Sequence, residues 1–236
     1  MVKWRLLNIL PYHGTHAVTS PDHLLITELF HSIQGESTHA GRPCFFVRCA
    51  RCPMRCRWCD TTYSFHGGTP MTVDQVMDAI RASGCKLVEL TGGEPLAQPA
   101  AARLARRLLE EHYEVLVETG GYFPLDRFPD GVAWILDVKC PGSGMADRNH
   151  WPNLERLNPK KDEVKFVVAD QADYEWSRRI IDRHDLFATT RAVLFSPVWG
   201  ELNPADLAAW ILRDRIPARL QLPLHKIIWG PERRGV

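Results

Sequence analysis

Short apolar runs rich in β-branched and aromatic residues alternate along this chain with segments of helical periodicity. The runs occupy residues 45–48, 86–90, 114–118, 134–139, 164–168, 192–195 and 219–224. Helical patterns occupy residues 72–84, 100–113, 171–185 and 204–216. Strands that alternate with helices form βαβ units, in which the strands run parallel. The alternation therefore predicts an α/β fold with a mainly parallel sheet.

The helical segments carry their own start and stop signals. In residues 72–84, Thr72 and Gln75 have the spacing of a capping box, and Gly84 marks a C-terminal stop. The segment 204–216 opens with Pro204, which suits the first turn of a helix. We expect both segments to be amphipathic helices that cover the sheet.

Polar, glycine-rich segments follow five of the apolar runs. They are TGGEP after residue 90, TGG after 118, CPGSG after 139, SPVWG after 195 and HK after 224. Because parallel strands end on one rim of a sheet, such loops meet there and build active sites. The pattern predicts a cofactor site that extends across this rim.

The absence of a period in the first residues predicts the domain organisation, and the absence of targeting segments predicts the compartment. Residues 1–23 show no clear period and are expected to form an N-terminal extension, whereas 24–236 form a single core domain. The formal net charge of +1 gives no reason to expect nucleic acid or a membrane as a direct partner. No convincing signal peptide or membrane-spanning run is found, so a cytoplasmic protein is expected.

Cysteines cluster after the first run. The chain has seven cysteines, an odd number, and a reducing compartment makes metal ligation the first interpretation. Cys52, Cys56 and Cys59 are spaced C-x3-C-x2-C in a segment without a strand pattern. Three thiolates can hold a four-iron cluster and leave one iron open, as in catalytic rather than structural metal sites.

A second set of ligands is possible from spacing alone. Cys44, Cys49 and Cys52 read C-x4-C-x2-C, the start of a two-iron site. If residues 45–48 form a strand, however, Cys44 and Cys49 lie roughly 16 Å apart, too far for one small cluster. We therefore expect Cys44 in the core and Cys49 as a neighbour of the cluster, with Cys85 and Cys140 as buried small hydrophobic residues.

At this point the chain resembles the radical S-adenosylmethionine (SAM) superfamily. The run Cys52, Cys56, Trp58, Cys59 is similar to its C-x3-C-x-aromatic-C loop, and TGGEP at 91–95 to its second, cofactor-binding motif. The resemblance implies a 4Fe-4S cluster, SAM as cofactor and a β/α barrel. With 236 residues, fewer than the roughly 250 of eight βα units, the barrel is expected to be incomplete.

Further motifs resemble the 7-carboxy-7-deazaguanine synthase family. They are HSIQGES at 31–37, GRPCFFVR at 41–48, WCDTTYSF at 58–65, ETGG at 118–121, DVKCPGSG at 137–144 and HKIIWGPERRGV at 225–236. The resemblance implies a lyase of queuosine biosynthesis. Such an enzyme converts 6-carboxytetrahydropterin to 7-carboxy-7-deazaguanine with loss of ammonia, uses SAM catalytically and needs magnesium. Against the family pattern, Cys49 replaces leucine, Arg51 glycine, Pro53 and Met54 the pair Asn-Leu, and Gly120 serine or asparagine.

The resemblance assigns residues to the cofactors. Trp58, Cys59 and Asp60 would lie near SAM, and Gly92 and Gly93 would let the backbone approach it. Glu94 would accept from its amino group. Further cofactor-side positions are Lys139, Pro141 and Ser143. Thr61 is the expected magnesium ligand, with substrate oxygens completing the site.

The same resemblance places the substrate. Gln34, with the backbone of Ile33 and Gly35, would read the edge of the pterin, and Arg48 would clamp its carboxylate. Glu36, Thr91, Glu118 and His225 are secondary candidates. A flavodoxin or ferredoxin is the expected electron donor, and a homodimer is the expected assembly.

Two other functions fit part of the pattern. An activase for a glycyl-radical enzyme would share the cysteine loop but lack the motifs at 31–37 and 41–48. A non-catalytic iron–sulfur electron carrier, or a zinc protein, would supply a fourth ligand and have no affinity for SAM. The electron carrier or zinc protein would leave TGGEP and the loops at the strand ends unexplained.

Overall fold

One sheet of nine strands forms the centre of the computed structural model, which describes residues 22–236. The extension expected over 1–23 falls outside the described part except for its last two residues, and His23 already opens the first strand. The strands are β1 His23–Ile33, β2 Pro43–Cys49, β3 Thr69–Thr72, β4 Leu87–Gly92, β5 Glu114–Thr119, β6 Ala133–Asp137, β7 Glu163–Val168, β8 Ala192–Pro197 and β9 Arg219–Leu220.

The sheet is an open, mainly parallel barrel. Its order is β3-β1-β2-β4-β5-β6-β7-β8-β9, and β3 and β9 are not paired with each other. Every pair from β2 to β9 is parallel, whereas β1 is antiparallel to both β2 and β3. The predicted incomplete barrel and its parallel core are confirmed.

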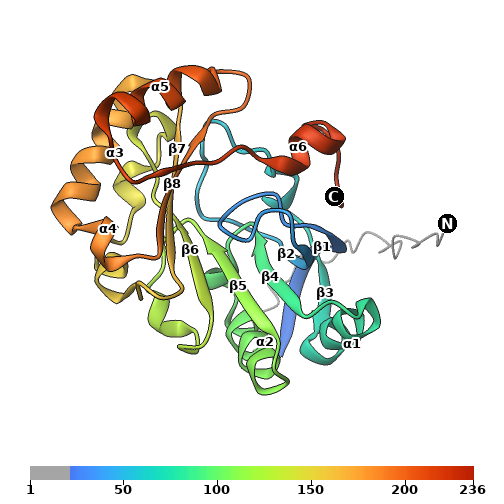
Figure 1. Cartoon of the computed structure of the whole chain (residues 1–236). Coiled ribbons are helices and arrows are strands. Elements are labelled where there is room, and N and C mark those ends of the chain that lie inside the picture. The colour runs from blue at the N-terminus through green and yellow to red at the C-terminus, as the bar shows by residue number, and fades with distance from the viewer. Residues whose placement is uncertain (1–21) are drawn as a thin grey trace.

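Helices cover the outside of this sheet. They are α1 Val73–Ser83, α2 Pro99–Glu110, α3 Gln171–His184, α4 Leu186–Thr189, α5 Pro204–Asp214 and α6 Leu224–Trp229. Figure 1 shows α1 near β3, α2 near β5, α3 to α5 beyond β7 and β8, and α6 apart from both groups, near β1 and β2. No α-helix joins β5 to β6 or β6 to β7, where short 3₁₀ turns stand instead. None of the helices in the described range is long and apolar enough to cross a membrane.

The local helix signals act as expected. The Thr72 side chain accepts from the backbone of Gln75, and the Gln75 side chain accepts from the backbone of Thr72, which completes the capping box of α1. Val76, Met77 and Ile80 of this helix have no exposed surface. The period read from the sequence therefore identifies the face that packs on the sheet.

The C-terminal part differs from the prediction. The run 219–224 was expected to be one strand, but only Arg219 and Leu220 pair with β8, and Leu224 already begins α6. Pro223 cannot donate a ladder hydrogen bond, so the strand ends before it. The expectation that His225 directly follows a strand is therefore wrong, because His225 lies in α6.

The loop between β1 and β2 closes the amino end of the barrel. The backbone of Thr38 donates to Glu163, the first residue of β7, at 3.0 Å. Arg42 forms two hydrogen bonds with Glu114, the first residue of β5, at 2.8 and 2.6 Å. With this end closed, the interior opens towards the carboxyl ends of the strands, where the predicted loops lie.

Candidate functional site

The cysteine loop lies between β2 and a 3₁₀ turn at Thr62–Ser64, over the carboxyl ends of the strands. Cys52, Cys56 and Cys59 are each partly exposed and free. Turn hydrogen bonds such as Cys59 N to Cys56 O, at 3.2 Å, shape the loop in place of regular structure. The three predicted ligands therefore share one irregular, accessible segment.

Backbone contacts fix this loop to the TGGEP segment. Gly93 N donates to Cys49 O at 2.8 Å, and Glu94 N donates to Arg51 O at 2.7 Å. A Cβ on Gly93 would lie 2.1 Å from Arg51 O, closer than any real side chain allows. Only glycine permits this approach, so Gly93 determines how the loop sits on β4.

Burial disfavours the thiolate form at two positions of this loop, Cys52 and Cys56. Burial raises the pKa of Cys52 to about 11, and burial likewise raises the pKa of Cys56. Thiolate is the form that ligates iron, so metal binding must displace these protons. Among residues 22–236 no three His, Cys, Asp or Glu side chains are grouped closely enough for a single metal ion. A four-iron cube, by contrast, spreads its ligand sulfurs widely, and three free thiols on one loop suit it.

The remaining cysteines belong to the core. Cys44 and Cys49 lie within β2 and have no exposed surface. Cys85 and Cys140 are also buried, and the Sγ of Cys140 lies 3.3 Å from Ser177 Oγ. The strand between Cys44 and Cys49 separates them as expected, so the alternative two-iron spacing has no structural support.

Two residues expected on the cofactor side form hydrogen bonds with other parts of the protein. The Glu94 carboxylate has no exposed surface and accepts from Thr119 Oγ1 at 2.8 Å, and from Leu96 N and Gly120 N at 3.1 Å. Ser143 Oγ donates to Cys140 O at 2.6 Å, while Ser143 O accepts from the backbone of Arg57 at 3.0 Å. Both residues therefore shape the loops from within instead of presenting a free side chain.

The other cofactor-side residues lie nearer the rim. Lys139 Nζ lies 2.8 Å from Asp137, and charge interactions link it to Cys56. Burial alone would lower the pKa of Lys139, but Asp137 and Cys56 raise it, so its ammonium is retained. Pro141 is exposed. The Trp58 ring lies 5.0 Å from the guanidinium carbon of Arg57, at the edge of the loop.

Asp60 and Thr61 face the C-terminal helix. Thr61 Oγ1 lies 3.8 Å from Cys59 Sγ and 3.3 Å from Asp60. The other oxygen of Asp60 is 2.5 Å from Lys226 Nζ of α6. Thr61 thus offers a hydroxyl beside Cys59, and its assignment to magnesium stays a prediction.

The substrate-side candidates converge inside the barrel. Gln34 follows Ile33, the last residue of β1, and its side chain donates to the buried carboxylate of Glu89 and accepts from Glu36 N at 2.9 Å. A Cβ on Gly35 would lie 2.3 Å from His225 Nδ1, so glycine allows α6 to approach this segment. Residues far apart in sequence are brought together here as predicted.

Arg48 is held by an acid on the neighbouring strand. Its Nε donates to Glu28 at 2.6 Å, and Tyr63 also donates to Glu28 at 2.8 Å. Its guanidinium carbon lies 5.6 Å from the Phe30 ring. Only Nε is engaged by Glu28, so the terminal nitrogens can still meet a carboxylate.

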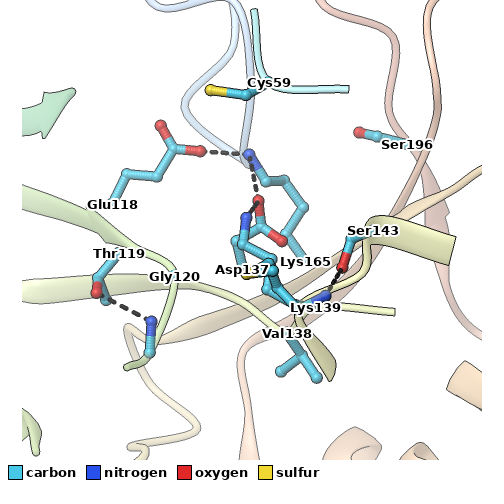
Figure 2. Close-up of polar contacts among 12 residues, drawn as sticks. Cys59, Glu118, Thr119, Gly120, Asp137, Val138, Lys139, Ser143, Lys165 and Ser196 are labelled. Atoms are coloured by element: carbon cyan, nitrogen blue, oxygen red, sulfur yellow. Dashed lines mark hydrogen bonds and ion pairs between the residues drawn. The ribbon is translucent and has the colours of Figure 1, made fainter. Parts of the chain in front are cut away.

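A buried ionic cluster that the sequence analysis did not identify completes the interior. Lys165 of β7 contacts Glu36 at 2.8 Å, Asp137 at 3.7 Å and Glu118, and Glu118 accepts from Thr91 at 3.1 Å. Figure 2 shows the Lys165 ammonium between the carboxylates of Glu118 and Asp137. One sequence signal could have indicated this cluster. Charged residues interrupt three of the apolar runs, at Glu89, Asp137 and Lys165, and the burial of a charged side chain is costly unless it has a partner or a function.

A cavity of about 290 Å³ lies elsewhere, at the amino ends of β6 and β7, and is lined by Phe128, Trp134 and Lys161 among others. Its buried acid, Asp162, already accepts from Trp134 N at 2.9 Å and Asn158 N at 2.8 Å, and pairs with Lys161. This buried acid is therefore satisfied within the protein, and the cavity lies at the rim opposite the cysteine loop.

Comparison with known proteins agrees with this fold and loop. Residues 46–136 match the family model described as "Radical SAM superfamily". The crystal structure of QueE from Escherichia coli superposes with a TM-score of 0.69 at 22% identity, covering 84% of this chain and 92% of that one. The partial barrel with its three-cysteine loop is thus the fold of a radical SAM enzyme.

Curated relatives narrow the class. The 7-carboxy-7-deazaguanine synthase of Chlorobaculum tepidum is 47% identical over 90% of this chain and 97% of its own length. That of Koribacter versatilis is 43% identical over 89% and 99%. The chain belongs to the 7-carboxy-7-deazaguanine synthase family. Membership implies a 4Fe-4S cluster and SAM, and it favours neither a glycyl-radical activase nor an electron carrier.

Proposed function

We propose that this protein converts 6-carboxytetrahydropterin to 7-carboxy-7-deazaguanine with loss of ammonia, in the cytoplasmic synthesis of 7-deazapurines such as queuosine. The observation that carries the proposal is the interior of the barrel. There Gln34, Glu36 and Glu118 converge with His225 beneath a loop of three free cysteines. Such a set of amide, carboxylate and imidazole groups suits a flat heterocycle with a donor–acceptor edge.

Cys52, Cys56 and Cys59 would hold the cluster, and the open iron would hold SAM. The bound cofactor supplies a primary carbon radical that removes a hydrogen atom from the substrate. The protein must orient the substrate and exclude water, and the closed amino end of the barrel serves both needs. Gly92 and Gly93 bring the backbone close to the cofactor, while Glu94 fixes that loop through Thr119 and Gly120.

Roles for the substrate side follow from chemistry. Because the buried Gln34 side chain is engaged by Glu89 and by Glu36 N, the backbone beside it would read the pterin edge, and the terminal nitrogens of Arg48 would meet the carboxylate. The ring contraction removes a proton from carbon and releases ammonia, so a base is needed. Glu118 would take that role, which its partly exposed carboxylate supports. Thr61 would bind a magnesium ion shared with substrate oxygens, since Mg²⁺ prefers oxygen ligands and keeps open positions.

The partners follow from the same scheme. Reduction of the cluster requires a one-electron donor, for which a flavodoxin or ferredoxin is proposed. We also propose a homodimer. Ile227, Ile228 and Trp229 of α6 are exposed apolar side chains that contact with a second copy would cover.

One anaerobic assay tests the reaction. The protein is reconstituted with iron and sulfide and mixed with dithionite, SAM, magnesium and 6-carboxytetrahydropterin, and the products are identified by mass spectrometry. We expect 7-carboxy-7-deazaguanine in excess over the SAM consumed. Formation of 5′-deoxyadenosine without that product would refute the substrate assignment, and omission of magnesium should lower the rate.

The ligand assignment has its own prediction. Cys56→Ala should abolish both the cluster absorbance and turnover, because two thiolates do not retain a four-iron cluster. Cys44→Ala is the matched control, since Cys44 is buried in β2, and it should keep both at a cost of about 1 kcal/mol or less in stability. A full cluster in the Cys56 variant, or its loss in the Cys44 variant, would overturn the assignment.

A further inference from the structure

Lys165 is the most enclosed member of the ionic cluster. Its side chain is 6% exposed, whereas those of Glu36 and Glu118 are 23% and 25% exposed. The ammonium thus lies behind the two carboxylates, which face the open interior of the barrel. Lys165 cannot reach a substrate without displacing them, but it determines where they point.

We propose that Lys165 is a positioning residue that holds Glu36 and Glu118 as an ionised pair directed at the substrate. The two acids come from different segments, Glu36 from the β1–β2 loop and Glu118 from the end of β5. Lys165 lies 129 residues from Glu36 and 47 residues from Glu118 in sequence, so the pair exists only in the folded barrel. The inference rests on the proposed function, because it assigns the acids to the substrate side.

The electrostatics of the neighbourhood require such a cation. Two carboxylates near each other repel, and without compensation one of them binds a proton. Burial would raise the pKa of Glu118, but the Lys165 ammonium holds it below its usual value. The other charged or titratable groups that face this cluster are Asp137 at the end of β6, Lys139 in the loop after it, Glu89 on β4, Arg48 on β2 and His225 on α6.

The arrangement is difficult to explain by stability alone. Burying an ammonium costs free energy that its partners only partly return, and apolar replacements of buried ion clusters are often neutral or stabilising. A lysine that contacts two partly exposed acids is therefore better explained by the direction it gives them.

The test compares Lys165→Met, which keeps the length and removes the charge, with Lys165→Arg, which keeps the charge. Lys160→Met, at an exposed lysine, is the matched control. Infrared difference spectra recorded against pH on the reconstituted protein report carboxyl protonation, and a Glu118→Gln sample identifies the Glu118 band. The same preparations are assayed for kcat/KM against pH.

We expect the protonation midpoint of Glu118 to rise by about 1 to 3 pH units in Lys165→Met. The acid limb of kcat/KM should move in the same direction, and the maximum should fall by about 100-fold or more. Lys165→Arg should restore most of both, and Lys160→Met should match the wild type. An unchanged midpoint, or an arginine variant as impaired as the methionine variant, would overturn the proposal.

Two further outcomes separate this inference from the proposed reaction. If the wild type forms no 7-carboxy-7-deazaguanine while the midpoint still shifts, the ion pair stands and the substrate assignment fails. If Lys165→Met does not fold, the midpoint is measured in Lys165→Gln, which removes the charge and keeps a hydrogen-bond donor. A Glu118 midpoint equal to that of the wild type in this variant would overturn the proposal.

Discussion

Glu89 shows how one residue in the barrel couples protonation to stability. It is buried, accepts from Gln34, and burial together with the nearby Glu118 raises its pKa well above the usual 4.5. The folded protein therefore keeps this proton when the unfolded chain has lost it, so the stability it contributes is full below about pH 4.5 and declines as pH rises. Its neutral form resembles an amide in shape and polarity.

Glu89→Gln should therefore remove this decline. We expect the free energy of unfolding to be higher in the variant by about 1 kcal/mol or more at pH 8, with the difference vanishing near pH 4. Denaturant unfolding across this range measures it. Glu110→Gln, at an exposed acid of α2, is the control and should show no such trend. A difference that stays constant with pH would show that Glu89 is ionised in the folded protein.

Some site residues can be predicted from sequence motifs, whereas others are recognised only from the fold. The spacing of Cys52, Cys56 and Cys59 was readable because ligands on one loop are close in sequence. The partners of Lys165 were not, because they lie on other strands and only the barrel brings them together. Glu94 shows a different limit of motif reading: the motif predicts a contact with the cofactor, whereas its carboxylate accepts hydrogen bonds from Thr119 and Gly120 within the protein.

At the scale of elements, the backbone contact between the cysteine loop and β4 leads to a prediction. Gly93→Ala places a Cβ against Arg51 O, so the loop must move away from the strand. We expect iron content per chain to fall severalfold while the sheet keeps its circular dichroism, with stability lowered by about 1 to 3 kcal/mol. Gly131→Ala is the control, because its Cβ would meet only the side-chain end of Leu109. Full iron loading of the Gly93 variant would show that this contact does not position the cysteine loop for the cluster.

Elements with a strong period were predictable from the sequence, and those without one were not. The helices α1, α2, α3 and α5 and the strands β2 and β4 to β8 match the segments expected from sequence, because each buries a continuous face. β1 and β3 were not predicted as strands. β3 is only four residues long with Pro70 inside, which an edge strand tolerates. At 219–224 the apolar alternation predicted a strand, but Pro223 ended it.

At the scale of the whole molecule, two segments close the open barrel, the β1–β2 loop and α6. The β1–β2 loop closes the amino end through contacts with the first residues of β5 and β7. On the open side, α6 joins the barrel through Leu224 N to Gly35 O at 3.0 Å and through Lys226 to Asp60 at 2.5 Å. None of the α6 residues is fully buried, so this closure contributes little to the core.

Removal of residues 224–236 should therefore separate folding from function. All nine strands and the helices α1 to α5 remain, so we expect Tm to fall by only a few degrees, equivalent to about 1 kcal/mol. Iron loading should persist, because no cysteine is removed. Turnover should fall by about 100-fold or more, since His225 and the Lys226 anchor of Asp60 are lost. His225→Ala should reproduce part of this loss with no change in Tm, whereas a truncated chain that no longer unfolds cooperatively would show that α6 belongs to the core after all.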